Sequence, residues 1–253
     1  MAYFSYCGKS VYYGEYGEGR TAIFLHGNTA SSKMFELLMP LYTDKFRCIL
    51  IDFLGNGRSD RVEKFPINLW YDEALQTIAL AEHLDSGKVS LIGTSGGAWA
   101  AVNAAMLRPD LFECIIADSF DGRTLNSRFS EKLLTERKAA KADPQARQFY
   151  EWCQGADWEE VVDLDTDALL RCAGEKTPLL CKPLEKLKVP VLLVGSREDE
   201  MCRDDLEQEY IEMAQLIPDA EISMFEHGGH PAVASNAEKV AEIITGFIER
   251  KSE

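Results

Sequence analysis

The stretch VSLIGTSGGAWAAVNAAM, residues 89–106, places a glycine-rich turn between an apolar run and a segment of small residues. The run VSLI (89–92) is typical of a strand that is buried on both faces of a sheet. The turn GTSGG (93–97) has the G-x-S-x-G pattern, in which glycines leave room for a tight strand-to-helix turn. Such a turn exposes its serine hydroxyl in a strained conformation, and the helix that follows favours developing negative charge. We therefore predict that Ser95 is a nucleophile.

The rest of the chain alternates between strand-like and helical patterns. Short apolar runs recur at 22–25, 48–51, 114–117, 191–194 and 222–225. Helical stretches lie between them, and the clearest repeats apolar residues at three- and four-residue spacing from Tyr71 to Leu84, behind a possible N-cap at Asn68. This alternation predicts an α/β fold with a doubly wound, mostly parallel sheet. Aromatic and β-branched residues on both sides of Gly8 predict an N-terminal hairpin.

One long segment interrupts the alternation. Residues 120–186 carry helix formers and charged residues but no strand-like run, and LKVP at 187–190 returns the chain to the sheet. An insertion of about 65 residues can form a lid but is too small for an independent domain. We expect an α/β core of residues 1–119 and 187–253 with a helical cap at 120–186, closed by an amphipathic helix at about 237–249.

Composition and charge exclude several classes of protein. The 253 residues are 46% hydrophobic and 27% charged, as in ordinary soluble globular proteins. No apolar run reaches the length of about eighteen residues that a membrane span needs, and the N-terminus lacks the pattern of a signal peptide. The net charge of 27 − 42 = −15 argues against nucleic acid or an anionic membrane as a partner. We expect a cytoplasmic protein.

The spacing of cysteines and histidines offers little material for a metal site. The seven cysteines include no C-x-x-C pair, and the four histidines include no H-x-x-x-H pattern. An odd number of scattered cysteines is typical of free thiols in a reducing compartment. No G-x-G-x-x-G dinucleotide motif occurs either. We therefore expect neither a metal nor a cofactor.

Two polar loops follow later strand-like runs and offer what a serine nucleophile needs. Serine at its ordinary pKa requires a base, and the base requires a carboxylate that fixes its tautomer. EHGGHP at 226–231 offers His227 and His230, and GSREDE at 195–200 offers Glu198 and Asp199. Residues just past the carboxyl ends of parallel strands gather at one edge of a sheet, so we expect these loops to lie beside Ser95.

Four motifs in a fixed order make the chain resemble the α/β-hydrolase superfamily, in its serine-nucleophile branch with a helical cap. They are HG at 26–27, DFLGNGRS at 52–59, SGG at 95–97 and GH at 229–230, the last ahead of the terminal helix. The resemblance covers nearly the whole chain outside roughly 120–186. It implies the fold that the alternation of strands and helices also predicts.

The resemblance implies roles for individual residues. Ser95 matches the nucleophile, and His230 matches the base because it stands in the G-H motif, whereas His227 does not. The oxyanion hole of the family uses two backbone N–H groups, which correspond here to those of Asn28 and Gly96.

The acid of the triad has three candidates. Asp199 is favoured because the residues after it resemble the continuation that the family usually shows. Glu198 stands at the usual distance from the glycine that ends the strand. Asp118 follows the run at 114–117, and some members of the family supply the acid from that strand.

The expected function is that of a serine hydrolase that cleaves small to medium carboxylic esters through an acyl-enzyme. Phe53 and the cap residues Trp152 and Trp158 are candidates to line the pocket for this small-molecule substrate. Haloalkane dehalogenases and epoxide hydrolases need a carboxylate nucleophile, so the serine at the elbow argues against those activities. The sequence does not indicate an oligomeric state.

Other functions are compatible with the same residues. A lyase, a hydrolase of carbon–carbon bonds or an acyltransferase can use the same triad. A ligand-binding protein can also be built on a hydrolase scaffold, although a pure binder has no physical need for all three groups.

Overall fold

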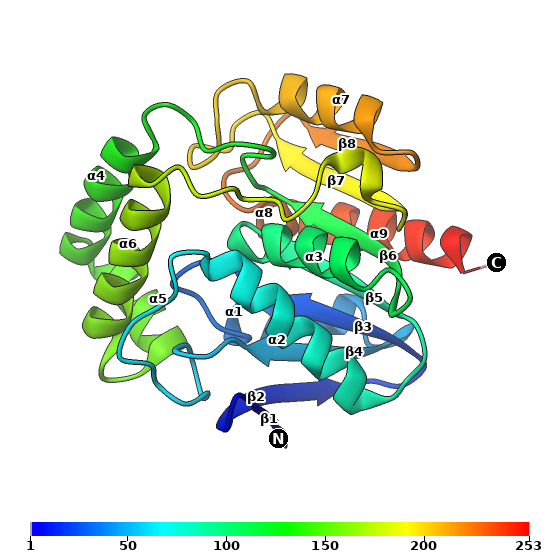
Figure 1. Cartoon of the computed structure of the whole chain (residues 1–253), viewed down its shortest axis with the longest axis horizontal. Coiled ribbons are helices and arrows are strands. Elements are labelled where there is room, and N and C mark those ends of the chain that lie inside the picture. The colour runs from blue at the N-terminus through cyan, green and yellow to red at the C-terminus, as the bar shows by residue number, and fades with distance from the viewer. Residues whose placement is uncertain (1, 253) are drawn as a thin grey trace.

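The structure, a computed structural model, describes residues 2–252 and is built around one eight-stranded sheet (Figure 1). The strand order is β1-β2-β4-β3-β5-β6-β7-β8. Neighbouring strands from β4 to β8 are parallel, whereas β2 runs antiparallel to both β1 and β4. The strands are β1 (Ala2–Tyr6), β2 (Lys9–Tyr16), β3 (Arg20–Leu25), β4 (Phe46–Asp52), β5 (Val89–Thr94), β6 (Phe112–Asp118), β7 (Val191–Ser196) and β8 (Ala220–Phe225).

The predicted sheet is confirmed, because each of the six apolar runs lies inside a strand. The central strands β5 and β7 are buried along their whole length, which explains their nearly continuous apolar sequences. The edge strand β8 is only half-buried. The N-terminal hairpin is also confirmed: β1 and β2 pair through a turn at Cys7 and Gly8, both of which have positive φ.

Helices cover both faces of the sheet, and each face has its own hydrophobic core. One core contains side chains of α2 (Leu69–Leu84), α3 (Gly96–Leu107) and α7 (Leu206–Leu216). The other contains side chains of α1 (Lys33–Glu36), the 3-10 helix η1 (Met39–Leu41), α8 (Ala232–Ser235) and α9 (Ala237–Lys251). Successive strand residues point to opposite faces, so Ile23 belongs to the first core and Phe24 to the second.

Three helices between β6 and β7 form the cap, which lies beyond the carboxyl ends of the strands (Figure 1). They are α4 (Phe129–Ala142), α5 (Pro144–Gln154) and α6 (Trp158–Gly174), and the chain returns to β7 through the 3-10 helix η2 (Leu184–Lys186). Tyr150, Trp158 and Val162 form a small core inside the cap. Leu133 and Leu169 instead join the first core of the sheet, so the cap is packed onto the rest of the molecule.

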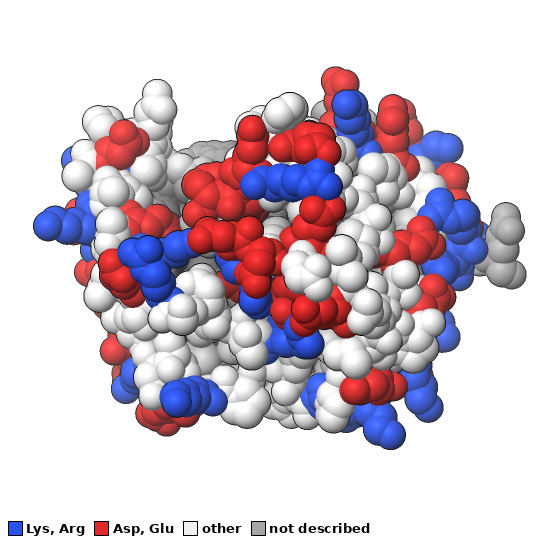
Figure 2. Space-filling view, turned by 90° about the horizontal axis from the view of Figure 1, so that it is seen from above, with Lys and Arg blue, Asp and Glu red and all other residues white. Residues whose placement is uncertain are grey.

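Acidic groups are prominent on the surface. Figure 2, which views the molecule from the side of α7, shows acidic side chains gathered across the middle of that face with basic ones among them. Several are paired, as Glu207 is with Arg197 and Asp205 is with Arg203. Within residues 2–252, no helix combines the length and the apolar content that crossing a bilayer requires.

Candidate active site

The elbow at Ser95 is formed where β5 meets α3. Ser95 has φ 55° and ψ −121°, a conformation that residues other than glycine rarely adopt. Its N–H donates to the carbonyl oxygen of Asp118 at 2.8 Å, and its own carbonyl oxygen accepts from the N–H of Ala98 at 3.0 Å. Neighbouring backbone thus holds the strained residue in place, as is common at active sites.

Close backbone packing explains the glycines of the elbow. A Cβ on Gly93 would lie 2.2 Å from the carbonyl oxygen of Gly97, and a Cβ on Gly97 would lie 2.2 Å from the carbonyl oxygen of Leu25. A Cβ on Gly27 would lie 2.9 Å from the Cβ of Ser95. The elbow therefore packs directly against the end of β3 and the H-G loop that follows it.

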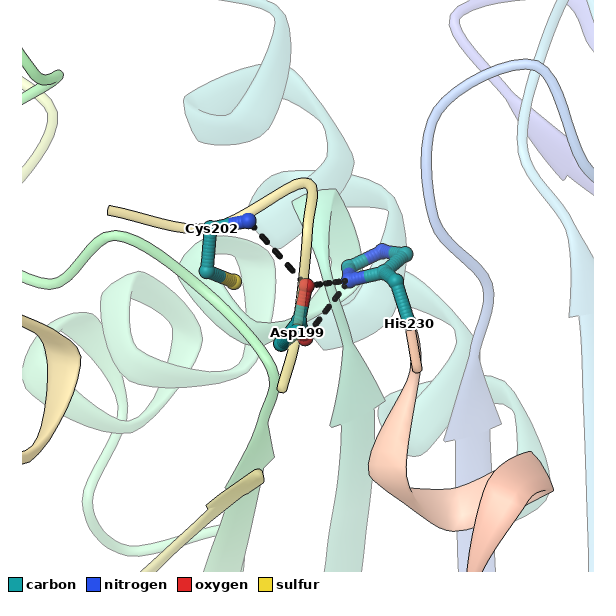
Figure 3. A group of neighbouring side chains, drawn as sticks. All are labelled: Asp199, Cys202 and His230. Atoms are coloured by element: carbon teal, nitrogen blue, oxygen red, sulfur yellow. Dashed lines mark hydrogen bonds and ion pairs between the residues drawn. The ribbon is translucent and has the colours of Figure 1, made fainter. Parts of the chain in front are cut away.

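His230 and Asp199 form a buried pair near the elbow (Figure 3). The Nδ1 atom of His230 lies 2.9 Å from Oδ2 and 3.1 Å from Oδ1 of Asp199. The side chain of Asp199 has no exposed surface, and that of His230 is 11% exposed. The N–H groups of Met201 and Cys202 each donate to Asp199 Oδ1 at 3.1 Å, which fixes the carboxylate. Asp199 follows β7 and His230 follows β8, so the two lie at the same edge of the sheet as Ser95.

The two groups favour each other's charged forms. Burial opposes the imidazolium form of His230, but the hydrogen bond and charge of Asp199, together with Asp118 and Glu200, outweigh it and raise the pKa of His230. Burial also opposes the carboxylate form of Asp199, but the hydrogen bonds and charge that it receives lower the pKa of Asp199. This pair is therefore suited to accept a proton on the imidazole.

Ser95 and His230 line the same cavity. In the described part of the chain, the ring of His230 is hydrogen-bonded to Asp199 and not to the Ser95 hydroxyl. Because both residues line this cavity, a substrate bound in it can contact both of them.

The two other candidate acids make no hydrogen bond to His230 in the described structure. Glu198 Oε1 lies 3.0 Å from Nδ1 of His227, in a pair whose side chains are 58% and 84% exposed. Asp118 is fully buried and accepts hydrogen bonds from Thr94 Oγ1 at 3.2 Å and from the N–H of Val233 at 3.4 Å. Burial raises the pKa of Asp118 to about 7. Of the three candidates, the structure brings Asp199 into hydrogen-bonding contact with His230.

Asn28 and Gly96, the expected carriers of the oxyanion donors, are in direct contact. A Cβ on Gly96 would lie 2.2 Å from Asn28 Oδ1, so the Asn28 side chain lies against the first residue of α3. Asn28 and Ser95 both line the cavity. The two backbone N–H groups thus belong to residues that flank the nucleophile.

The neighbouring loops are held by His26 and Asp52. His26 Nδ1 lies 2.9 Å from the carbonyl oxygen of Gly27, and its Nε2 accepts from the N–H of Phe53 at 3.1 Å. Asp52 accepts from the N–H groups of Ser32 at 2.7 Å and Arg58 at 2.8 Å. Neither His26 nor Asp52 is part of the cavity wall, so both shape the loops around the site.

A mainly apolar cavity of about 510 Å³ lies between the elbow and the cap. Aromatic side chains of the core and the cap supply much of its wall, namely Trp70, Trp99, Phe120, Phe129, Phe149 and Tyr150. The rings of Trp70 and Trp99 lie 4.3 Å apart beside the elbow. The charged side chains in the wall are those of Asp121, Lys132, Glu136 and Arg137.

The three pocket residues expected from the sequence are not part of this wall. Phe53 is fully buried under the loop, with its ring 4.9 Å from that of His26. Trp158 is stacked on Tyr150 at 5.6 Å inside the core of the cap. Trp152 lies on the surface side of α5 and is partly exposed. Helical spacing identifies an apolar face but not its partner, which is why sequence alone misplaced the two tryptophans.

One group among residues 2–252 could supply three metal ligands: Asp199, Cys202 and His230, whose ligand atoms lie within 4.8 Å of one another (Figure 3). A metal there would need the Cys202 thiolate and the lone pair of His230 Nδ1. Burial and the charge of Asp199 raise the pKa of Cys202 well above its usual value, which favours the thiol. The Nδ1 atom is already engaged by Asp199. The geometry fits a hydrogen-bonded carboxylate and imidazole better than a metal centre.

Comparisons with known proteins bear on the family and the fold. The model of a family described as "Alpha/beta hydrolase family" matches residues 22–243. The chain is 36% identical over 107 residues to 2-(acetamidomethylene)succinate hydrolase of Mesorhizobium japonicum, a match that covers 42% of this chain and 37% of that relative. The chain thus spans about two fifths of the length of this curated relative.

Solved structures match over almost the whole chain. A meta-cleavage product hydrolase from Pseudomonas fluorescens IP01 has a TM-score of 0.81 at 17% identity, over 99% of this chain and 98% of the other. A thermophilic esterase from Thermogutta terrifontis has a TM-score of 0.75 at 18% identity, over 98% of this chain and 97% of the other. At these identities the likeness shows the fold alone.

Proposed function

The chain belongs to the alpha/beta hydrolase family, and we propose that it is a serine hydrolase that cleaves small to medium carboxylic esters through an acyl-enzyme on Ser95. The observation that carries this proposal is the buried Asp199–His230 pair at the cavity that Ser95 also lines. A pure binding site would gain nothing from a strained serine beside a base whose tautomer is fixed. In the proposed reaction the strained serine is the nucleophile, and the histidine with its carboxylate is the base.

The reaction begins when the hydroxyl oxygen of Ser95 attacks the ester carbonyl carbon. Its proton passes to Nε2 of His230, while Asp199 holds the Nδ1–H and stabilises the imidazolium. The tetrahedral intermediate collapses when the carbon–oxygen bond to the alcohol breaks and His230 returns the proton to that alcohol. A water molecule then repeats the sequence on the acyl-enzyme, releasing the acid and restoring Ser95.

Negative charge on the carbonyl oxygen is stabilised by the N–H groups of Asn28 and Gly96. Such donors stabilise the transition state more than the ground state, because the oxygen gains its charge only when the tetrahedral intermediate forms. The N-terminus of α3 points at the same place and contributes its dipole. A cavity of about 510 Å³ accommodates a small-molecule substrate, and its aromatic wall favours apolar acyl or alcohol groups.

Two measurements on the purified protein test this function. Aryl esters with acyl chains of two to eight carbons should be hydrolysed, and a fluorophosphonate probe should label the protein covalently. Mapping the labelled peptide distinguishes Ser95 from Ser119, the other serine that lines the cavity. Ser95→Ala should abolish both the hydrolysis of esters and the covalent labelling. If the unaltered protein neither hydrolyses esters nor reacts with the probe, the proposed function is wrong.

A further inference from the structure

The side chain of Asn28 is hydrogen-bonded at both ends. Its Nδ2 donates to Asp165 Oδ2 in the cap at 2.7 Å, and its Oδ1 accepts from Trp70 Nε1 in α2 at 3.0 Å. None of these groups is needed for the proton transfers of the proposed reaction. They do fix the position of the residue whose N–H is the expected oxyanion donor.

The loop that carries Asn28 needs such restraint. Thr29 has φ 58°, a left-handed conformation that costs energy for a residue with a branched side chain. Two further bonds from the cap hold the same loop: Gln154 Nε2 donates to the carbonyl oxygen of Ala30 at 2.7 Å, and Ser31 Oγ donates to the carbonyl oxygen of Cys153 at 3.0 Å. The cap therefore braces this loop from Asn28 to Ser31.

Asp165 is held in place from the opposite side. It is 2% exposed, and its Oδ1 accepts from Arg137 Nη2 at 3.3 Å. Arg137 is itself buried and donates through Nη1 to Glu136 at 2.8 Å and to the Tyr150 hydroxyl at 3.3 Å. A buried carboxylate is costly unless it is paired and hydrogen-bonded, so this network ties Asp165 to one orientation.

We propose that Asp165 is a positioning residue for the oxyanion hole, which acts from the cap by holding Asn28 against Gly96 and beside Ser95. This inference rests on the proposed function. It makes the cap a part of the catalytic machinery as well as a cover for the cavity. In this proposal Asn28 contributes twice. Its backbone N–H donates to the substrate, and its side chain is held by the hydrogen bond to Asp165.

Enzymes with matched substitutions on α6 test the inference. In Asp165→Ala, kcat for a short aryl ester should fall about 10- to 100-fold while KM changes little, because misplacing one oxyanion donor weakens transition-state binding. Asn28→Ala removes the same hydrogen bond and also the one from Trp70, while it keeps both Arg137 and Asp165, and it should lose at least as much activity. Asp163→Ala is the control, since Asp163 is an exposed carboxylate on the same helix, paired with Lys141.

A trifluoromethyl ketone separates oxyanion binding from folding and from substrate binding. Ser95 adds to its carbonyl carbon, the serine proton passes to His230, and the former carbonyl oxygen becomes an oxyanion. Its inhibition constant should rise in Asp165→Ala by the same factor as kcat falls. Asp165→Asn, which keeps an oxygen acceptor for Asn28 Nδ2, should recover part of the loss.

A double-mutant cycle of Asn28→Ala and Asp165→Ala decides whether the two residues act as one unit. If Asp165 acts through Asn28, the double variant should lose little more than Asn28→Ala alone. Additive losses, or a loss confined to KM, would overturn the inference. Full activity of Asp165→Ala in a protein that hydrolyses esters would overturn it too and leave the proposed function intact. The proposed function itself fails if the unaltered protein neither hydrolyses esters nor is labelled at Ser95.

Discussion

Two histidine–carboxylate pairs lie close together at the carboxyl edge of the sheet. Residues 198 and 199 supply the two acids, and residues 227 and 230 supply the two imidazoles. In both pairs Nδ1 lies about 3 Å from a carboxylate oxygen, at 3.0 Å in His227–Glu198 and 2.9 Å in His230–Asp199. They differ in their surroundings, since the first pair is exposed to solvent and the second is buried at the cavity.

The comparison shows that residue types and distance do not make a catalytic pair. In water an ion pair contributes little, and its partners are free to separate. In the buried pair, the backbone N–H groups after Asp199 fix the carboxylate, and the carboxylate in turn fixes the imidazole. We therefore expect activity to depend on the buried pair and to be nearly independent of the exposed one.

The histidines should give the largest contrast. His230→Ala removes the base and should lower kcat/KM for an aryl ester by about 10⁴-fold or more, as loss of a triad member does. His227→Ala should retain activity within about threefold, because a pair that is exposed to solvent contributes little. Steady-state kinetics of the two variants, with circular dichroism as a folding control, make the test. Equal losses in both would remove the distinction between the pairs.

The carboxylates should follow with a smaller contrast. Asp199→Asn leaves His230 in the wrong tautomer and should cost about 10³- to 10⁴-fold in kcat. Glu198→Gln should cost less than about threefold, since its partner is at the surface. Asp118→Asn should also be mild, because Asp118 makes no hydrogen bond to His230 in the described structure. A loss in Asp118→Asn that matched Asp199→Asn would reassign the acid.

The same contrast between cavity and solvent extends to the aromatic residues of α5. Phe149 and Trp152 are similarly exposed, at 39% and 37%, but only Phe149 lines the cavity. Phe149→Ala enlarges the cavity and should shift kcat/KM toward longer acyl chains by about 5- to 20-fold. Trp152→Ala should keep the parental chain-length profile. A series of aryl esters measures both, and a shift in Trp152→Ala alone would show that the cavity wall is assigned wrongly.

The pH dependence should give the smallest effect. In the proposed mechanism neutral His230 is the base, so kcat/KM should rise with pH through its pKa, which Asp199 and its neighbours hold above the ordinary value for histidine. Glu200→Gln removes a negative charge that favours the imidazolium, so the pKa should fall and the rise should move to lower pH by a few tenths of a unit. Glu198→Gln is the matched control and should leave the profile unchanged.

Most of the fold could be predicted from the sequence because the burial of a strand determines which types of residue it contains. A strand that is covered on both faces needs apolar residues throughout, and each predicted run lies in a strand. The strand-to-helix turn at Ser95 could also be predicted, because its G-x-S-x-G pattern reflects the lack of space for a side chain at Gly93 and Gly97. The start of α2 was also indicated, because the helix begins at Leu69, directly after the predicted N-cap Asn68, although the Asn68 side chain makes no capping hydrogen bond.

The contents of the cap could not be predicted in the same way. Asp163, Asp165 and Asp167 look alike in the sequence EEVVDLDTDAL, yet only Asp165 is buried. It accepts a hydrogen bond from Asn28, which is 137 residues away along the chain, and no local pattern reports such a contact.

The position of the cap between β6 and β7 determines how it could be exchanged for the cap of another protein. The cap leaves after β6 and returns at β7, and these two strands are neighbours in the sheet. Because β6 and β7 are parallel, the insertion leaves the sheet at its carboxyl edge after Asp118 and has to cross to the opposite edge before Val191, through residues 175–190 and η2. A foreign cap would therefore replace α4 to α6 and leave this crossover in place. The graft would preserve the fold, but a donor cap that offers no acceptor to Asn28 would yield a well-folded and slow enzyme.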